Sequence, residues 1–263
     1  MTPVSKRLVE DYESEMLVRE RSKHVSDSST QTQETTAADI LSSETLGNEI
    51  VQIYVGQKRK HFSVHKKLIC DRSKYFNGAF NRGFMEAGSG ELYLPEDYSA
   101  DAFDHLIDFI YRKALPHYEL NDYTRFVALY HLAHQLGMDD LMNDLIDDVR
   151  KKHMDYNCCF GPRASKLIYS NSDSGSKLRA LAAFEIVVDL HEASWHEFGD
   201  TKEFEDKYAE FFNEAPEAGA DFFRAQCRYT QEVWNHTTRK IPHAAADECD
   251  FHIHLDGKVS CAD

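Results

Sequence analysis

The 263-residue chain combines an ordinary hydrophobic content of 42% with a formal net charge of −15. This acidic balance disfavours binding to nucleic acid or to an anionic membrane, because both need clustered basic side chains. No apolar run approaches the roughly 20 residues of a membrane span. The six cysteines form no CxxC pair and nothing resembles a signal peptide, so we expect an intracellular protein, cytoplasmic or nuclear, with reduced thiols.

The N-terminal part of the chain is polar, and residues 22–36 carry almost no large apolar side chain. Such a segment buries too little surface to offset the entropy lost on ordering. We therefore predict that residues 1–45 are disordered.

The first regular pattern is an alternation of apolar and polar residues. It predicts a strand over residues 50–56 with Val51, Ile53 and Val55 on its buried face. Phe62 and Val64 repeat the alternation, which predicts a second strand.

At His65 the apolar spacing becomes helical, and Ser73 stands where the N-cap of a second helix would lie, over residues 74–81. Leu92 and Leu94 indicate a third strand. Residues 99–112 then repeat apolar side chains at helical spacing. The expected order is strand, strand, helix, helix, strand, helix.

Two more helices complete this region. Asn121 or Asp122 can cap the first of them, and Gly137 can end it. The second covers residues 139–152 and has an aspartate-rich face. Residues 160–238 are helical in pattern only, which predicts a C-terminal helical extension, and residues 239–263 form a polar tail.

An ordered set of residues with fixed gaps runs through residues 62–111. Its members are Phe62, Val64, His65, Lys66, Leu68, Cys70, Ser73, Tyr75, Phe76, Phe84, Glu86, Ala87, Leu92, Leu94, Pro95, Glu96, Asp97, Phe103, Leu106, Ile107, Phe109, Ile110 and Tyr111. In this set the chain resembles BTB/POZ domains, most closely the small single-BTB proteins of fungi, over residues 46–152. The resemblance implies an α+β fold, a small β-sheet flanked by helices, followed here by the α-helical extension.

Six of these residues serve as the signature of the fold, namely Phe62, His65, Lys66, Ser73, Tyr75 and Phe76. His65 is the one that could suggest catalysis. Both its position at a strand-to-helix junction and the resemblance favour a structural role. We expect its imidazole to bond backbone groups left unpaired at the start of the helix.

The resemblance implies a non-catalytic protein–protein interaction module that self-associates as a homodimer, recruits a partner protein, or does both. No cofactor, metal or small-molecule substrate is expected. The candidate partner interface comprises Leu68, Ile69, Tyr75, Phe76 and Phe103.

Two branches of the family suggest more specific roles. In the zinc-finger branch an aspartate and a basic residue form a charged pocket; Lys66 fits the basic position, but Ile50 stands at the acidic one, beside Glu49. In the cullin-binding branch a hydrophobic-x-acidic motif contacts the ubiquitin-ligase scaffold. The segment beginning at Phe103 continues with Asp104 and His105 and lacks the acid at the expected place. We therefore keep the role of substrate adaptor of a cullin-dependent ligase as the alternative function, behind the general interaction role.

A remote alternative is a metal-dependent hydrolase. His252 and His254 resemble the His-x-His segment on the first strand of adenosine-deaminase-type enzymes, where two histidines at i and i+2 share a metal ion. That chemistry needs further ligands from a (β/α)₈ barrel of roughly 250 residues. Nothing upstream follows that pattern.

Overall fold

The computed structural model describes residues 46–83, 85–193, 201–233 and 246–254. Its sheet contains β1 (Ile50–Val55), β2 (Lys60–His65) and β3 (Glu91–Tyr93), in the order β2-β1-β3. β1 pairs antiparallel with β2 and parallel with β3. The predicted alternation is confirmed, because Val51, Ile53 and Val55 are almost completely buried.

Three short helices connect the hairpin to β3. They are α4 (Lys66–Arg72), α5 (Lys74–Asn81) and α6 (Met85–Ser89), and α5 has the bounds that the sequence predicts. The sequence prediction lacked α6. Its five residues contain no buried side chain, so no apolar periodicity marks them.

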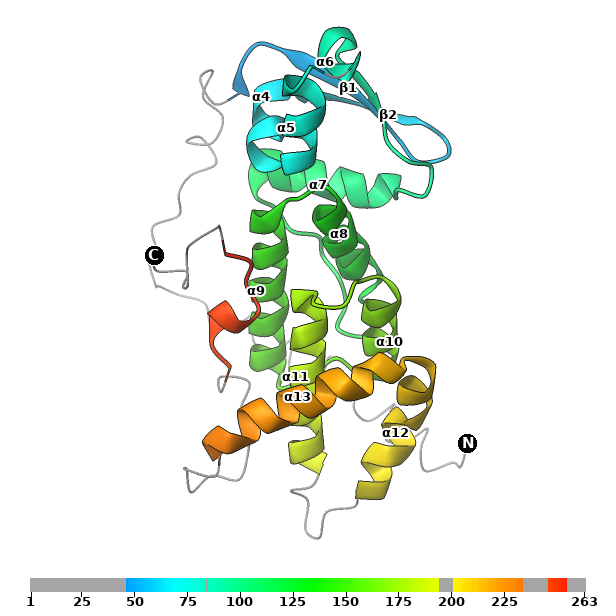
Figure 1. The fold of residues 1–263 in the computed structure, drawn as a ribbon, viewed down its shortest axis with the longest axis vertical. Coiled ribbons are helices and arrows are strands. Elements are labelled where there is room, and N and C mark those ends of the chain that lie inside the picture. The colour runs from blue at the N-terminus through cyan, green and yellow to red at the C-terminus, as the bar shows by residue number, and fades with distance from the viewer. Residues whose placement is uncertain (1–45, 84, 194–200, 234–245, 255–263) are drawn as a thin grey trace, which may run out of the picture. The chain divides into compact units, whose positions relative to one another are not determined.

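Three longer helices lie beneath the sheet (Figure 1). They are α7 (Ala100–Arg112), α8 (Thr124–Gln135) and α9 (Asp139–Tyr156). Each buries an apolar stripe, and α9 extends four residues beyond its predicted end at residue 152. This arrangement of a three-stranded sheet flanked by helices confirms the predicted α+β class.

The region after residue 160 is helical, as predicted. It contains α10 (Pro162–Ser170), α11 (Lys177–Ala193), α12 (Thr201–Glu214) and α13 (Pro216–Val233), followed by a short 3-10 helix, η2 (Glu248–Asp250). Nearly every side chain from Leu178 to Val188 in α11 is buried, because α10, α12 and α13 all pack against this helix.

A polar cluster with no exposed side chain joins α9 to α11. His153 and Glu185 are both 0% exposed, and His153 Nδ1 lies 2.7 Å from Glu185 Oε1. The other His153 nitrogen, Nε2, lies 2.8 Å from the Tyr123 hydroxyl, and Glu185 Oε2 accepts the backbone N–H of Phe160 at 2.8 Å. We call Tyr123, His153, Phe160 and Glu185 the buried polar cluster.

All described residues belong to one compact unit, residues 40–263. The predicted disorder of residues 1–45 lies outside the described residues, as does most of the predicted polar tail. The predicted boundaries between the BTB-like region and the helical extension stay predictions. Among the helices that the structure describes, none combines the length and hydrophobicity that crossing a bilayer requires.

Candidate interaction surface

The junction between β2 and α4 is organised by Tyr111, at the end of α7. Its hydroxyl accepts the backbone N–H of His65 at 3.1 Å and lies 2.8 Å from His65 Nδ1. The predicted imidazole bond to backbone groups is therefore wrong: the imidazole bonds a side chain, and the Lys66 N–H donates instead to the carbonyl of Glu49 at 2.8 Å. The Lys66 ammonium also pairs with the Glu49 carboxylate at 2.9 Å, so Glu49 rather than Ile50 supplies the acid here.

Ser73 fixes the position of α5. Its Oγ accepts the backbone N–H of Phe76 at 3.2 Å, which is the predicted N-cap. The same hydroxyl donates to the carbonyl of Leu136 at 2.6 Å. One side chain therefore caps α5 and ties it to the C-terminal end of α8.

Most of the predicted partner interface lies inside the molecule. Leu68 is 5% exposed, and Ile69, Phe76 and Phe103 are each 0% exposed. These four side chains stabilise the packing of α4, α5 and α7, and in this conformation they cannot contact a partner. A periodic apolar pattern marks such residues but does not say whether the apolar face meets solvent or core.

Tyr75 is the predicted interface residue that reaches solvent, with 38% of its surface exposed. Partial burial and the neighbouring carboxylate of Glu86 raise the pKa of its hydroxyl. The pKa of Tyr98 is also raised, by burial first and then by the proximity of Tyr75. Helix α6, packed beside α5, adds Met85 at 88% exposure. We call Tyr75, Met85 and the neighbouring Tyr98, which lies between β3 and α7, the α5–α6 surface.

A second aromatic group, which the sequence prediction missed, lies on the outer face of the sheet. Tyr54 stacks on Tyr93 with ring centroids 4.5 Å apart and on His61 with centroids 5.0 Å apart. The three rings come from three adjacent strands, and Tyr93 is 56% exposed. The sequence contained a signal for this aromatic group. Tyr54 and His61 occupy the positions of β1 and β2 that alternate with the buried ones and therefore face away from the core.

Phe103, the residue at the start of the cullin-like segment, packs edge-on against the ring of Phe62 with centroids 4.7 Å apart. The following Asp104 forms an ion pair with Lys60. This geometry adds no support to the cullin-adaptor alternative, which stays a prediction from the resemblance.

One of the two candidate metal ligands at the C-terminal end of the described chain, His252, already pairs with a carboxylate. His252 Nε2 lies 2.7 Å from Asp147 Oδ1 on α9, and residues 252–254 are irregular rather than part of a strand. Within the described ranges, no group of three or more His, Cys, Asp or Glu side chains is arranged to hold a metal ion. The two-histidine strand expected for the hydrolase alternative is therefore not present.

A family model described as BTB/POZ domain matches residues 50–153, close to the predicted range of 46–152. A search of curated proteins finds no match to this sequence.

Proposed function

Because residues 50–153 are a BTB/POZ domain, a module of protein–protein interaction, we propose that this chain is a non-catalytic interaction protein that self-associates or recruits a partner through the α5–α6 surface. The family match supports the interaction role most directly. The choice of surface depends on the distribution of exposed apolar side chains.

Exposed large hydrophobic side chains are concentrated in the first half of the BTB/POZ domain. Six are exposed among the described residues, and four of them lie between residues 50 and 93. The four are Ile50, Tyr75, Met85 and Tyr93, and the other two are Met154 and Phe223. Aromatic and methionine side chains are enriched in protein interfaces, where a few of them carry most of the binding free energy. Of the helical positions in this group, Tyr75 and Met85 lie on adjacent helices, which favours the α5–α6 surface.

The test is the solution mass of the full chain, measured by light scattering over a range of concentrations. We expect the mass to rise above the 30.3 kDa of one chain as concentration increases. Replacing Tyr75 by Lys puts a charge into the centre of the proposed interface. We expect it to weaken self-association by about 30-fold, the effect of losing a hot spot worth ~2 kcal/mol.

The matched control is Met154→Lys, which introduces the same charge at another exposed apolar residue, on α9. It should leave the mass curve unchanged. If the wild-type chain is monomeric, the proposal requires a captured partner that Tyr75→Lys loses and Met154→Lys retains. A monomer without such a partner would contradict the proposed function.

A further inference from the structure

The last described stretch of the chain lies along α9 (Figure 1). We call residues 246–254 the C-terminal segment. The residues of α9 that hold it are Asn143, Asp147 and Arg150, whose spacing of four and three residues places them on one helix face. One face of α9 therefore holds the segment on both sides of its 3-10 turn, η2.

Three side chains bind the main chain of the segment. The Asn143 carboxamide donates to the carbonyl of Ile253 at 3.0 Å and accepts its N–H at 2.8 Å. Arg150, itself 7% exposed, donates to the carbonyl of Ala246 at 2.8 Å. Lys177 of α11 donates to the carbonyl of Asp250 at 3.0 Å. Hydrogen bonds to the main chain, combined with pockets for side chains, are also how proteins bind peptides of a partner.

The aromatic side chain of the segment fills a pocket. Phe251 is 1% exposed, and its ring centroid lies 5.6 Å from that of Phe184 and 5.1 Å from the Arg150 guanidinium carbon. The buried ring therefore anchors the segment between α9 and α11.

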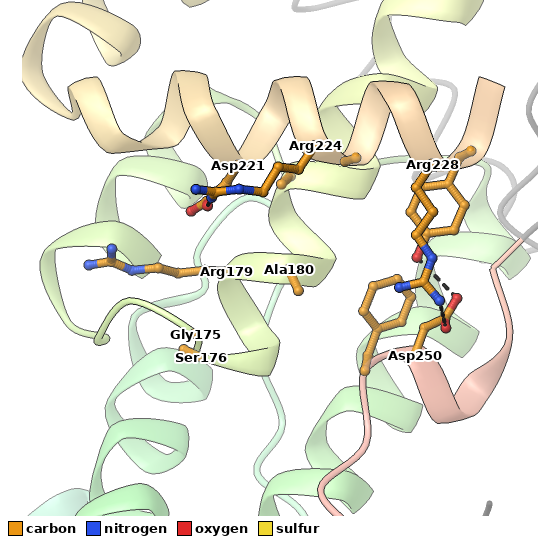
Figure 2. A pocket seen from close by; sticks show the side chains of 12 residues that line it. Gly175, Ser176, Arg179, Ala180, Asp221, Arg224, Arg228 and Asp250 are labelled. Carbon is orange, nitrogen blue, oxygen red and sulfur yellow. Dashed lines mark hydrogen bonds and ion pairs between the residues drawn. The ribbon is translucent and has the colours of Figure 1, made fainter. Parts of the chain in front are cut away.

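The neighbouring side chains are bound by charge and hydrogen bonds. The Asp250 carboxylate pairs with Arg228 of α13, as Figure 2 shows, and accepts the Tyr229 hydroxyl at 3.0 Å. On the other side of Phe251, His252 pairs with Asp147. The groove thus binds three successive side chains in the order acidic, aromatic, histidine.

The segment does not fill the groove completely. A cavity of about 190 Å³ remains beside Asp250 and Phe251, at the junction of α11 and α13. Figure 2 shows Arg224 and Arg228 on its α13 side, with Arg224 paired to Asp221 at 2.6 Å. A ligand with a longer acidic side chain could extend into this space.

From this geometry we infer that α9, α11 and α13 form a peptide-binding groove for a segment of a partner protein that carries an acidic, an aromatic and a histidine residue in succession, and that the C-terminal segment occupies the groove as an internal competitor. The inference does not depend on the α5–α6 surface.

A competitor within the same chain controls how tightly an outside ligand binds. A ligand joined to its site by a short linker has an effective concentration of the order of millimolar, so a partner peptide must exceed that competition. Weakening the internal competitor should therefore strengthen binding of an outside peptide to the same groove.

The probe is a labelled synthetic peptide with the sequence of residues 246–254, and binding to the full chain is followed by fluorescence anisotropy under reducing conditions. Replacing Phe251 by Ala in the chain removes the anchor of the internal competitor and leaves the groove residues intact. We expect this variant to bind the peptide at least roughly tenfold more tightly than the wild-type chain does. Phe223→Ala, the same change at an exposed phenylalanine, should bind as the wild type does.

A second pair of variants tests the groove itself. Adding Asn143→Ala to the Phe251→Ala chain should weaken peptide binding roughly tenfold, because it removes both bonds to the main chain of residue 253. Adding Asn121→Ala, at an exposed asparagine before α8, should not. A peptide that itself carries Ala in place of Phe251 should bind no variant.

Three outcomes would overturn the inference. One is a folded Phe251→Ala chain, judged by circular dichroism and cooperative unfolding, that binds no peptide up to about 1 mM. The second applies if that chain does not fold. Asp250→Ala then removes the Arg228 and Tyr229 contacts of the segment instead, and a failure of this variant to bind the peptide more tightly counts equally. The third is a wild-type dimer that Phe251→Ala abolishes and Tyr75→Lys retains, which would assign the groove to a second copy of the chain.

Discussion

Ser73 makes two hydrogen bonds, one within its own helix and one that holds this helix against another. It accepts the Phe76 N–H within α5 and donates to the Leu136 carbonyl at the end of α8, while only 1% of the residue is exposed. Ser99 makes the first kind of bond alone, since its Oγ caps α7 by accepting the Ala102 N–H at 3.2 Å. The two serines therefore separate the effect of capping from the effect of a tertiary hydrogen bond.

We predict that Ser73→Ala costs more free energy of unfolding than Ser99→Ala. Loss of a cap costs ~1 kcal/mol, which both variants share. Ser73→Ala also removes one of the two donors to the Leu136 carbonyl, which keeps the Tyr75 N–H at 3.3 Å, and the lost hydrogen bond adds ~0.5–1.5 kcal/mol. Urea unfolding of both variants measures the difference, and equal costs would show that the Leu136 bond contributes nothing.

The ends of α8 and α5 meet at Gly137, where backbone conformation and packing act together. Gly137 has a φ of +61°, and a Cβ atom added there would lie 3.0 Å from the Cβ of Lys74. Within α5, by contrast, Gly78 has ordinary helical geometry, and a Cβ atom added to it would meet no other atom within 4 Å. The same substitution should therefore have opposite effects at these two positions.

We predict that Gly137→Ala destabilises the chain and Gly78→Ala stabilises it. The left-handed conformation costs ~1–2 kcal/mol for a residue with a Cβ, before the contact with Lys74 is added. Alanine is better than glycine in a helix interior by ~0.5–1 kcal/mol. Thermal unfolding should show a lower Tm for the first variant and a higher Tm for the second, by ~2–4 °C for each kcal/mol. Shifts of the same sign would contradict this account.

At the scale of the whole molecule, the buried polar cluster joins the BTB/POZ domain to the helices that follow it. Tyr123 precedes α8, His153 lies on α9 and Glu185 lies in the middle of α11, and Glu185 also accepts the Phe160 N–H from the connecting segment. Because Glu185 is 0% exposed, its removal takes away a buried acceptor from the Phe160 N–H and a buried partner from His153 Nδ1. The cluster should therefore couple the two parts of the chain in unfolding.

We predict that Glu185→Ala lowers the free energy of unfolding by ~3–5 kcal/mol, since it removes two buried hydrogen bonds, to His153 and to the Phe160 N–H, and creates a cavity. Glu205→Ala, at an exposed glutamate of α12, should change it by less than ~0.5 kcal/mol. Chemical unfolding followed by circular dichroism measures both, and the wild-type chain should unfold in one transition. Two separate wild-type transitions, or a loss below ~1 kcal/mol for Glu185→Ala, would show that the cluster does not couple the two parts.

Local pattern by itself determined a large part of this fold. The alternation at Val51, Ile53 and Val55 placed the first strand, and Ser73 and Gly137 marked helix ends correctly. These features depend on residues within one turn or one strand, where backbone geometry and side-chain period act directly. The ordered residues that led to the BTB/POZ assignment also depend on local sequence pattern.

Tertiary structure decided which of these residues meet each other and which meet solvent. Phe103 and Ile69 belong to the core rather than to an interface, and His65 bonds Tyr111 on a distant helix rather than its own backbone. Asn143 binds Ile253, which lies 110 residues further along the chain. No period within a single element encodes such pairs, because they arise only when separate elements pack and each polar group finds the partner that packing brings near.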